Sequence, residues 1–445
     1  MSQQDGTFPD IAPWASPAAR TRIAEVAADL ADLWGGLSAD GVARTVEGAL
    51  REHARQFDDE GIVLYAGTNA MSGAARRAAE APVGGRPSMG WPGEKYQAGL
   101  DRLDLLEVLT PALVARLVGA RFAEVRSHSA TMANLAVYTA LTEPGDTIAV
   151  LPERAGGHTS HHAAGAPGVR GLRVVELPYD VDAYDVDLDA LPGFLRSERP
   201  RLVVIGASLL LFPHRIAAIK EVVSEAGASL LYDASHMAGL VAAGRFQRPL
   251  TEGADLLTFS TYKSFGGPPG GVIATDDAAL AERTSDAVFP GLTANYDAGR
   301  LAPLAVTAAE ILDDGGAYAD RCVAAARSFA SALAEEGFTV AGADRGFTDS
   351  HHVAVDVAAL GGGRAAMARL AEAGVYLSAI GLPWQRDGEP DRGLRIGTQE
   401  VVRRGLGDAD LRRVAALMAD LLLRDTDPGP VREAVARIRR SSAGL

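Results

Sequence analysis

The chain has 445 residues, of which 47% are hydrophobic and 22% are charged, and its formal net charge is -14 at pH 7. These values are typical of a globular protein with two domains and a large core, and the acidic balance argues against nucleic-acid binding. The N-terminus does not have the form of a secretory signal, and no apolar run approaches the roughly 20 residues that span a membrane. Because the single cysteine, Cys322, cannot form an internal disulfide, we expect a cytoplasmic protein.

The first part of the chain is expected to be a helical arm over residues 1–80. Residues 17–56 show an amphipathic helical pattern, which Gly35-Gly36 breaks and which resumes near Ser38, a typical N-cap residue. Residues 82–99 contain many glycines and prolines and are therefore expected to form a loop.

The middle of the chain, residues 81–300, is expected to be the large, ligand-binding domain. After a helical pattern from Leu103, strands are expected at residues 124–126, 147–151, 172–177, 202–205, 229–232, 256–259 and 272–274, with helices between them that include 131–141 and 215–225. Near-continuous Val, Ile and Leu runs between helices indicate an α/β fold with a mainly parallel sheet covered on both faces. In such sheets ligands bind beyond the carboxyl ends of the strands.

The last part, residues 301–445, is expected to form a smaller α+β domain. It opens with a helical pattern from about residue 302 to residue 333, which we expect to be interrupted at Gly315-Gly316.

Two of the expected strands end in residues of particular chemical interest. Asp233 follows the strand 229–232, and Lys263 lies just after the strand 256–259. A carboxylate and a lysine in these positions are how one large group of enzymes holds pyridoxal 5'-phosphate (PLP). The lysine forms a Schiff base with the aldehyde, and the carboxylate keeps the ring nitrogen protonated.

Three further segments offer groups to such a cofactor. Ser129, the Ala130 amide and Thr131 begin an expected helix, where an anion such as a phosphate can bind. His158 follows two glycines and could lie over the cofactor ring, and we expect no metal there because no third ligand has suitable spacing. We expect the neighbouring His161 to be at the surface or the pocket rim.

Several motifs together resemble serine hydroxymethyltransferase, a PLP enzyme of fold type I (aspartate aminotransferase-like). The resemblance extends from about residue 60 to residue 405, and its strongest matches are HSATMANLAVYTALTEPGDT, AGGHTSH, DASHMAGLVAAG, TYKSFGGPPGG, SDAVFPG and LRIGTQEVVRRG. It implies a cofactor site composed of Ser129, Ala130, Thr131, His158, Ser208, Asp233, His236, Ser260 and Lys263.

The resemblance also implies roles for these residues. Lys263 would carry the cofactor, and His158 would stack on its ring. Ser208 and His236 would bind on the side of the phenolic oxygen, and Arg395 would bind the substrate carboxylate through its guanidinium fork. The family further implies a homodimer in which each active site is completed by the neighbour, with Tyr96 and the loop 289–295 as candidates.

The chain departs from the family where folate would bind. The family has a Tyr and a Glu where this chain has Pro87 and Met89, and the Glu is tied to proton handling and to the folate reaction. Glu153 and Thr159 replace a leucine pair that packs against folate, and Tyr262 replaces the His before the lysine. These changes predict an enzyme that does not use tetrahydrofolate.

The expected function is aldol, retro-aldol or transaldol chemistry at Cα of glycine, serine, threonine or another β-hydroxy amino acid, with an aldehyde as a possible co-substrate. Cleavage needs a base for the β-hydroxyl, and with Met89 in place of the Glu the candidates are His158, His236 and Tyr96. Two alternatives stay open. One is Cα–H chemistry of the racemase or aminotransferase type, which needs only Lys263 as base, and the other is a catalytically silent binding protein with the PLP fold.

Overall fold

The computed structural model describes residues 8–386 and 388–442. The chain forms two compact units, the first ending at Gly61 and the second beginning at Ile62. The first unit contains the helices α1 (Pro17–Asp29), α2 (Ala31–Gly35) and α3 (Ala39–Ala54), followed by a π-helical turn, η1 (Arg55–Glu60). Helix α3 begins where predicted, because the Ser38 hydroxyl accepts a hydrogen bond from the Gly41 amide and so caps the helix.

The second unit is built around a seven-stranded sheet with the strand order β2-β10-β9-β8-β7-β3-β4. Its strands are β2 (Phe122–Glu124), β3 (Thr147–Val150), β4 (Arg173–Glu176), β7 (Leu202–Ile205), β8 (Ser229–Asp233), β9 (Leu256–Ser260) and β10 (Gly271–Thr275). Five of them, from β4 to β9, run parallel, and β10 is antiparallel to both of its neighbours. The predicted mainly parallel sheet is therefore confirmed.

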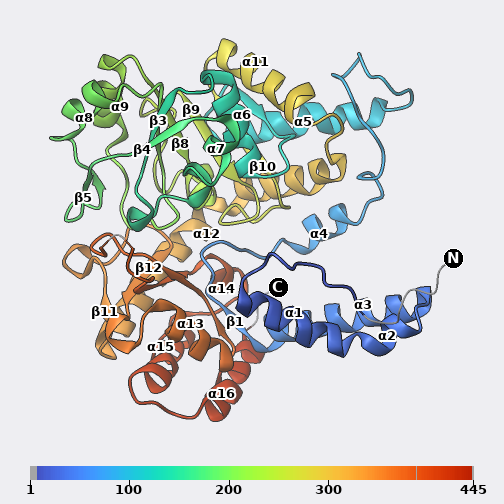
Figure 1. Ribbon diagram of the computed structural model, residues 1–445, viewed down its shortest axis with the longest axis vertical. Helices are drawn as coiled ribbons and strands as arrows, with labels where there is room; N and C mark the ends of the chain where they lie inside the picture. The colour runs from blue at the N-terminus through green and yellow to red at the C-terminus, as the bar shows by residue number, and fades with distance from the viewer. Residues whose placement is uncertain (1–7, 387, 443–445) are drawn as a thin grey trace. The chain divides into compact units, whose positions relative to one another are not determined.

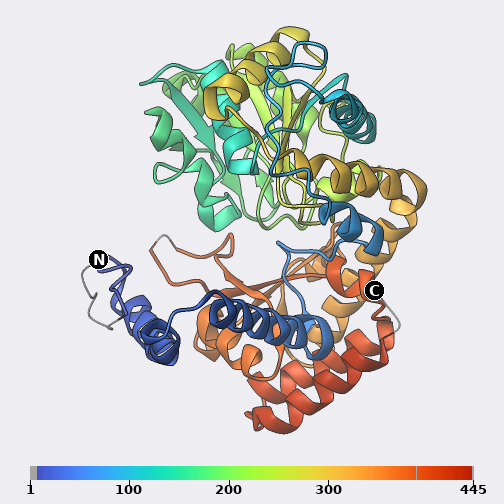
Figure 2. The same cartoon turned by 90° about the vertical axis from the view of Figure 1, so that its right-hand side faces the viewer.

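Helices cover both faces of this sheet (Figures 1 and 2). One face packs on α6 (Ala130–Leu141), α7 (Ala166–Arg170) and α11 (Ala278–Asp286), and the other on α5 (Asp101–Val118), α8 (Leu191–Glu198), α9 (Ile216–Glu225), α10 (Ala238–Ala242) and α12 (Leu301–Glu335). Successive strand residues point to opposite faces, so Leu230 and Tyr232 of β8 join one core while Leu231 joins the other. Both faces are buried, which is why the strands read as continuous apolar runs.

Helix α12 is continuous through Gly315-Gly316, so the expected interruption is wrong. Gly315 is closely surrounded. A Cβ there would lie only 2.7 Å from the Ile311 side chain of the same helix, and it would be in ordinary contact, at 3.6 Å, with Ala243 at the end of α10. Glycine costs a helix about 1 kcal/mol relative to alanine, and the apolar face buried along the rest of α12 outweighs this local preference.

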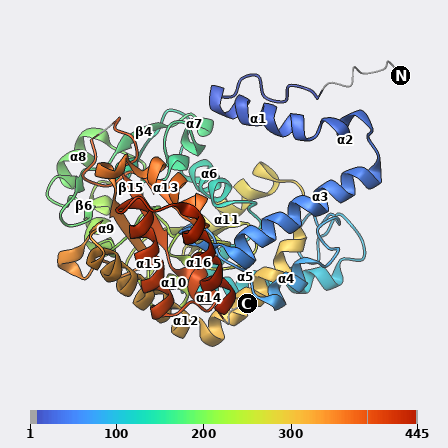
Figure 3. The ribbon, with the colours of Figure 1, turned by 90° about the horizontal axis from the view of Figure 1, so that it is seen from below.

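The C-terminal part has its own sheet and core. The sheet has the order β11-β12-β15-β14 and consists of β11 (Thr339–Val340), β12 (His352–Asp356), β15 (Gly393–Gly397) and β14 (Ser378–Ile380), each antiparallel to its neighbours. The helices α13 (Gly363–Glu372), α15 (Asp408–Leu422) and α16 (Pro428–Ser441) pack together beside it (Figure 3). The short strand β1 (Ile62–Val63) joins this part of the molecule by pairing in parallel with β13 (Val375–Tyr376).

Helix α12 belongs to both cores. Its first half packs under the large sheet through residues such as Leu304 and Ala308, and its second half packs in the C-terminal core through Phe329 and Leu333. In the described part of the chain, no helix is long and apolar enough to cross a membrane.

Candidate active site

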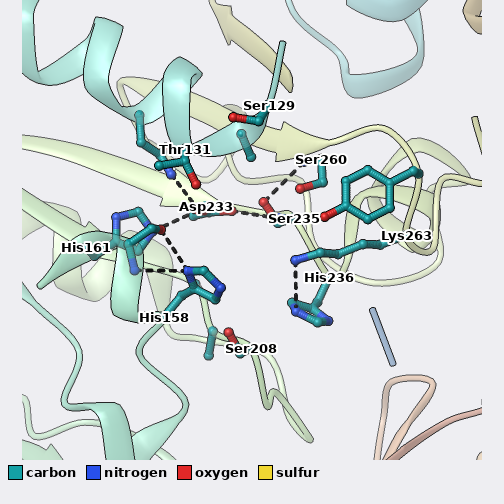
Figure 4. A pocket seen from close by; sticks show the side chains of 16 residues that line it. Ser129, Thr131, His158, His161, Ser208, Asp233, Ser235, His236, Ser260 and Lys263 are labelled. Atoms are coloured by element: carbon teal, nitrogen blue, oxygen red, sulfur yellow. Dashed lines mark hydrogen bonds and ion pairs between the residues drawn. The ribbon is translucent and has the colours of Figure 1, made fainter. Parts of the chain in front are cut away.

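A cavity lies where the carboxyl ends of β7, β8 and β9 face the N-terminus of α6 (Figure 4). It is lined by Ser129, Ala130, Thr131, Asn134, His158, Ser160, His161, Gly206, Ala207, Ser208, Asp233, Ser235, His236, Ser260, Tyr262 and Lys263. The structure therefore brings together every residue that the sequence assigned to the cofactor. Arg395 lines an adjoining cleft, and Tyr96 lines neither space.

Lys263 is buried, and its amino group points into the cavity toward His236. The distance between Lys263 Nζ and His236 Nε2 is 3.1 Å. His236 Nδ1 lies 3.1 Å from the Ala66 carbonyl oxygen, which can only accept, so Nδ1 carries the proton and Nε2 accepts from the lysine. Burial lowers the pKa of Lys263 to about 8, with the positive charge of Arg395 acting in the same direction and Asp233 opposing it.

Asp233 is buried at the end of β8 and receives three hydrogen bonds. His161 Nε2 lies 2.8 Å and Asn134 Nδ2 3.0 Å from Oδ2, and the Ser235 amide donates to Oδ1 over 2.8 Å. Burial alone would raise the pKa of Asp233, but His161 and the other donors hold it well below the usual range. Asp233 is therefore a permanent negative charge facing the cavity.

His161 was expected at the surface or the pocket rim; it does line the cavity, but it is buried, with 3% of its surface exposed. A single 3-10 turn, η3 (Thr159–His161), directs its ring inward against Asp233, where the Tyr138 hydroxyl of α6 contacts Nδ1. Burial holds the pKa of Tyr138 well above its usual value, so the hydroxyl stays protonated. It therefore donates a hydrogen bond to His161 Nδ1. The result is a buried Tyr138–His161–Asp233 chain of hydrogen bonds that places the His161 proton on Nε2, facing the carboxylate.

The N-terminus of α6 forms one end of the cavity. Ser129 caps the helix by accepting from the Met132 amide over 3.2 Å, and Ala130 and Thr131 begin its first turn. A Cβ at Gly271 would lie 2.2 Å from the Ser129 carbonyl oxygen, so only glycine permits this approach of β10 to α6. The helix dipole and the free amides of the first turn make this end suited to an anion.

His158 reaches the cavity because two glycines precede it. A Cβ at Gly157 would lie 2.0 Å from the Leu151 carbonyl oxygen, and Gly156 has a φ of +86° and packs against Leu209. His158 Nδ1 accepts from the Ser160 amide over 3.1 Å, which places the ring proton on Nε2. His158 reaches solvent, but it is also partly enclosed by protein. This partial burial lowers the pKa of His158, and the positive charge on Lys263 lowers it further, so the ring is neutral.

Ser208 and Arg395 lie side by side on the cleft that adjoins the cavity. Arg395, on β15, donates through Nη1 to the Ser208 carbonyl oxygen over 2.7 Å and through Nε to Ser378 Oγ over 3.3 Å. Burial lowers the pKa of Arg395 to about 10, which leaves it charged at neutral pH. The Ser208 hydroxyl is buried and, among the described residues, has no hydrogen-bond partner.

Tyr96 is 77% exposed on a loop that is itself firmly held. Lys95 forms a buried ion pair with Glu107 of α5, and the same carboxylate accepts from Ser88 Oγ over 2.6 Å and from Tyr296. The loop thus leaves Tyr96 exposed, and Tyr96 is not among the residues that line the cavity.

This arrangement fits PLP at each of its functional groups. Lys263 can take the aldehyde, Asp233 can pair with the ring nitrogen, and the N-terminus of α6 can take the phosphate. The Ser208 hydroxyl lines the same cavity as His236 and has no hydrogen-bond partner among the described residues, so it can donate to the cofactor. His158 lies at the side of the cavity, opposite Lys263 (Figure 4).

Sequence reasoning did not assign seven residues of the lining, namely Asn134, Ser160, His161, Gly206, Ala207, Ser235 and Tyr262. Asn134 could have been found, because it lies one helical turn after Ala130 and so faces the same way. His161 and Ser235 depend on turn geometry that has no local sequence signal. Tyr262 was noticed only as a replacement for the family's His.

Comparisons with known proteins place these motifs in a family. The model of the family described as serine hydroxymethyltransferase matches residues 43–418. An α-methylserine aldolase of Variovorax paradoxus is 42% identical over 428 residues, which is 96% of each chain. A serine hydroxymethyltransferase of Korarchaeum cryptofilum is 40% identical, and the match covers 89% of this chain and 94% of that one.

A solved structure shares the fold over nearly the whole chain. The L-threonine transaldolase of Pseudomonas fluorescens superposes with a TM-score of 0.82 at 26% sequence identity, covering 96% of this chain and 93% of that one. The fold-type-I architecture predicted from the sequence is therefore confirmed.

Proposed function

The chain belongs to the serine hydroxymethyltransferase family, and within it we propose a folate-independent aldolase that acts on β-hydroxy amino acids of the α-methylserine type. The cofactor is PLP, and the chemistry is aldol-type cleavage or formation of a C–C bond at Cα of a small amino acid. The end-to-end similarity to α-methylserine aldolases is the observation on which the choice of substrate rests.

The substrate itself restricts the reaction. α-Methylserine has no hydrogen on Cα, so Cα–H abstraction cannot begin its conversion, and the bond to the hydroxymethyl group is the one that can break. Cleavage removes the hydroxyl proton, releases formaldehyde and leaves an electron pair at Cα, which takes a proton to give alanine. PLP, when bound, supplies an aldehyde that links to the amino group and a ring that withdraws this electron pair.

The positions of the side chains suit this sequence of events. Arg395 is placed to bind the substrate carboxylate and so to orient the bonds at Cα. Asp233, always ionised, is placed to hold a proton on the ring nitrogen. Lys263, whose lowered pKa makes it a proton carrier near neutral pH, is placed to deliver the proton to Cα.

Of the three candidate bases for the hydroxyl proton, the geometry favours His236. Its Nδ1 proton is committed to the Ala66 carbonyl, so Nε2 becomes a free acceptor when Lys263 moves away. His158 has the opposite tautomer, because its Nδ1 already accepts from the Ser160 amide. Tyr96 would have to come from a neighbouring subunit.

Replacing His236 with asparagine is expected to slow formaldehyde release by about a hundredfold or more, the usual contribution of a general base. Exchange of the Cα proton of alanine with deuterated water, followed by NMR, should stay close to the unmodified rate because it needs Lys263 and not the base. His158→Asn is the matched control. Selective loss of formaldehyde release in that variant, with His236→Asn active, would transfer the role to His158.

Independence from folate is expected because the cleft beyond His158 is lined by Glu153 and Thr159, a charged and a polar side chain. Formaldehyde release from α-methylserine should be the same with and without tetrahydrofolate. In a glycine titration, the long-wavelength absorption band should also be indifferent to tetrahydrofolate. A band that grows only when tetrahydrofolate is present would identify a true hydroxymethyltransferase and would contradict the proposed independence from folate.

A transaldol variant of the same chemistry is the second candidate. The bond cleavage is shared, but a second aldehyde captures the electron pair at Cα before a proton does. The cleft beside His158 and Arg395, which also includes Gln385, offers space for that aldehyde. New β-hydroxy amino acids formed when an aromatic aldehyde is added to the aldolase assay would distinguish this activity from simple cleavage.

We further propose a homodimer with shared active sites. On α5, Leu105, Val108 and Leu109 form an exposed apolar stripe, and Trp91 and Tyr96 are exposed on the nearby loop. Mixing Lys263→Ala subunits with Tyr96→Ala subunits should therefore restore activity, because one of the two sites in each hybrid keeps both side chains. Activity that stays at the level of the separate variants would show that Tyr96 does not complete the neighbour's site.

The cytoplasm is the compartment we propose for this activity. Cys322, the single cysteine, is buried in α12, and burial raises the pKa of its thiol to about 12. An oxidising compartment would therefore add no intramolecular disulfide that could stabilise the fold.

A further inference from the structure

Lysine is rare in this chain. Of its 43 lysines and arginines, three are lysines, namely Lys95, Lys220 and Lys263, and the others are arginines. The difference matters toward aldehydes, because a lysine amine that loses its proton becomes a nucleophile, whereas a guanidinium keeps its charge in proteins. Three side-chain amines in the whole chain can therefore add to an aldehyde.

Lys95 is enclosed, and its ammonium is fully used. Its side chain is 7% exposed and forms an ion pair with Glu107. Nζ also donates to Ser88 Oγ over 3.0 Å and to the Gly90 carbonyl oxygen over 2.9 Å. An ammonium has three donors, so these three contacts occupy all of them. The nitrogen has no lone pair to offer unless this network opens.

Lys220, on α9, is less enclosed but is held by a carboxylate. Its side chain is 24% exposed, and both oxygens of Asp255 accept from Nζ, over 2.8 Å and 2.7 Å. Asp255 Oδ2 also accepts from the Leu230 amide over 2.7 Å, which fixes the carboxylate. The amine can attack an aldehyde only after it has given up these charge-assisted hydrogen bonds and its proton.

Lys263 is the exception. Its amino group bonds to His236 rather than to a carboxylate, and its pKa of about 8 gives it a neutral fraction near pH 7. It lines the cavity, where it is placed to hold the cofactor. Among the described residues, the lining of the adjoining cleft includes Arg154, Arg386 and Arg395 but no lysine. An aldehyde that leaves through this cleft meets guanidinium groups instead of amines.

We propose that the PLP-loaded enzyme resists modification by the formaldehyde it releases, because no lysine amine outside the cofactor site is available to react. The modification begins when an amine lone pair forms a C–N bond to the carbonyl carbon. The C=O π pair takes up the proton that the nitrogen loses and becomes a hydroxyl, and loss of water then gives an imine. The proposal rests on the proposed function for the identity of the aldehyde.

The test adds formaldehyde to the PLP-loaded enzyme together with cyanoborohydride, which reduces each imine to a stable methylamine. Labelled peptides are identified by mass spectrometry, and the N-terminal amine is followed as a separate peptide. Arg364→Lys provides the exposed reference amine, since the Arg364 side chain is 79% exposed and lies 3.6 Å from Asp391. Lys95 and Lys220 should be labelled at least about tenfold more slowly than this reference, the factor that one charge-assisted hydrogen bond supplies.

Asp255→Asn tests the reason for the protection of Lys220. Loss of the carboxylate charge should raise the labelling of Lys220 by about tenfold or more and leave that of Lys95 unchanged. Labelling of Lys95 or Lys220 in the unmodified enzyme at the rate of the reference amine overturns the proposal. This comparison also decides the matter should Asp255→Asn fail to fold.

The failure of this proposal and the failure of the proposed function are distinguishable. The labelling experiment supplies its own formaldehyde and contains no amino-acid substrate, so its outcome does not depend on the reaction that the enzyme catalyses. An enzyme that released no formaldehyde from α-methylserine would contradict the proposed function and leave the labelling pattern as it is. Rapid labelling of Lys95 or Lys220 in an active aldolase would contradict the resistance alone.

Discussion

Replacement of Lys263 with alanine is expected to lower formaldehyde release from α-methylserine by about a thousandfold or more, since both the covalent anchor and the proton carrier are lost. Lys263 is the one lysine in the cavity lining, and its amino group is buried beside His236. Added methylamine should restore part of the activity by occupying the space that the side chain leaves. Lys220→Ala, which removes a lysine paired with Asp255 outside the cavity, should remain fully active.

The lowered pKa gives the same lysine a measurable pH dependence. Only the neutral amine adds to an aldehyde, and with a pKa of about 8 roughly a tenth of Lys263 is neutral at pH 7. The rate at which cofactor-free protein captures PLP, followed by stopped-flow absorbance, should therefore rise with pH and level off above the pKa. A rate that keeps rising to pH 10 would show an ordinary lysine. Arg395→Leu should move the midpoint upward, because the guanidinium helps to lower the pKa.

The second large effect is expected at Asp233. Asp233→Asn should lower turnover by about a hundredfold or more, because an amide cannot stabilise a proton on the ring nitrogen. The new amide would also place a donor group among His161 Nε2, Asn134 Nδ2 and the Ser235 amide, all of which already donate. Turnover is measured under saturating PLP, with bound cofactor determined separately, so that weak binding is not mistaken for slow chemistry.

Two companion variants separate charge from position. Asp233→Glu keeps the charge but displaces it, and should retain more activity than Asp233→Asn. Tyr138→Phe removes only the far end of the hydrogen-bond chain, and should cost about tenfold or less because His161 keeps its contact with the carboxylate. Equal activity in Asp233→Asn and the unmodified enzyme would show that the negative charge has no part in catalysis.

The strand-end residues of this site could be predicted because parallel strands bring their carboxyl ends to one edge. Asp233, Lys263 and Ser129 follow or precede recognisable elements, and all three line one cavity. His161 was misplaced because its direction depends on a 3-10 turn that follows two tightly packed glycines. Gly156 packs on the backbone of the distant Leu209, and Gly157 packs on the backbone of Leu151 and Pro152. The continuity of α12 was missed for a similar reason, since burial against Ala243 is invisible in the local sequence.

Helix α12 has a consequence for which amino acids can be used. Near its start, Gly267 of the Lys263 loop packs on Leu304 and Thr307. Near its middle, the Cys322 carbonyl accepts from Thr398 Oγ1 over 2.7 Å, just beyond the strand that carries Arg395. One uninterrupted helix therefore fixes the distance between the loop of Lys263, where the substrate amine is received, and the strand of Arg395, where the carboxylate is received. The amine and carboxylate of a β- or γ-amino acid are one or two carbons farther apart, so we expect such a substrate not to fit this distance.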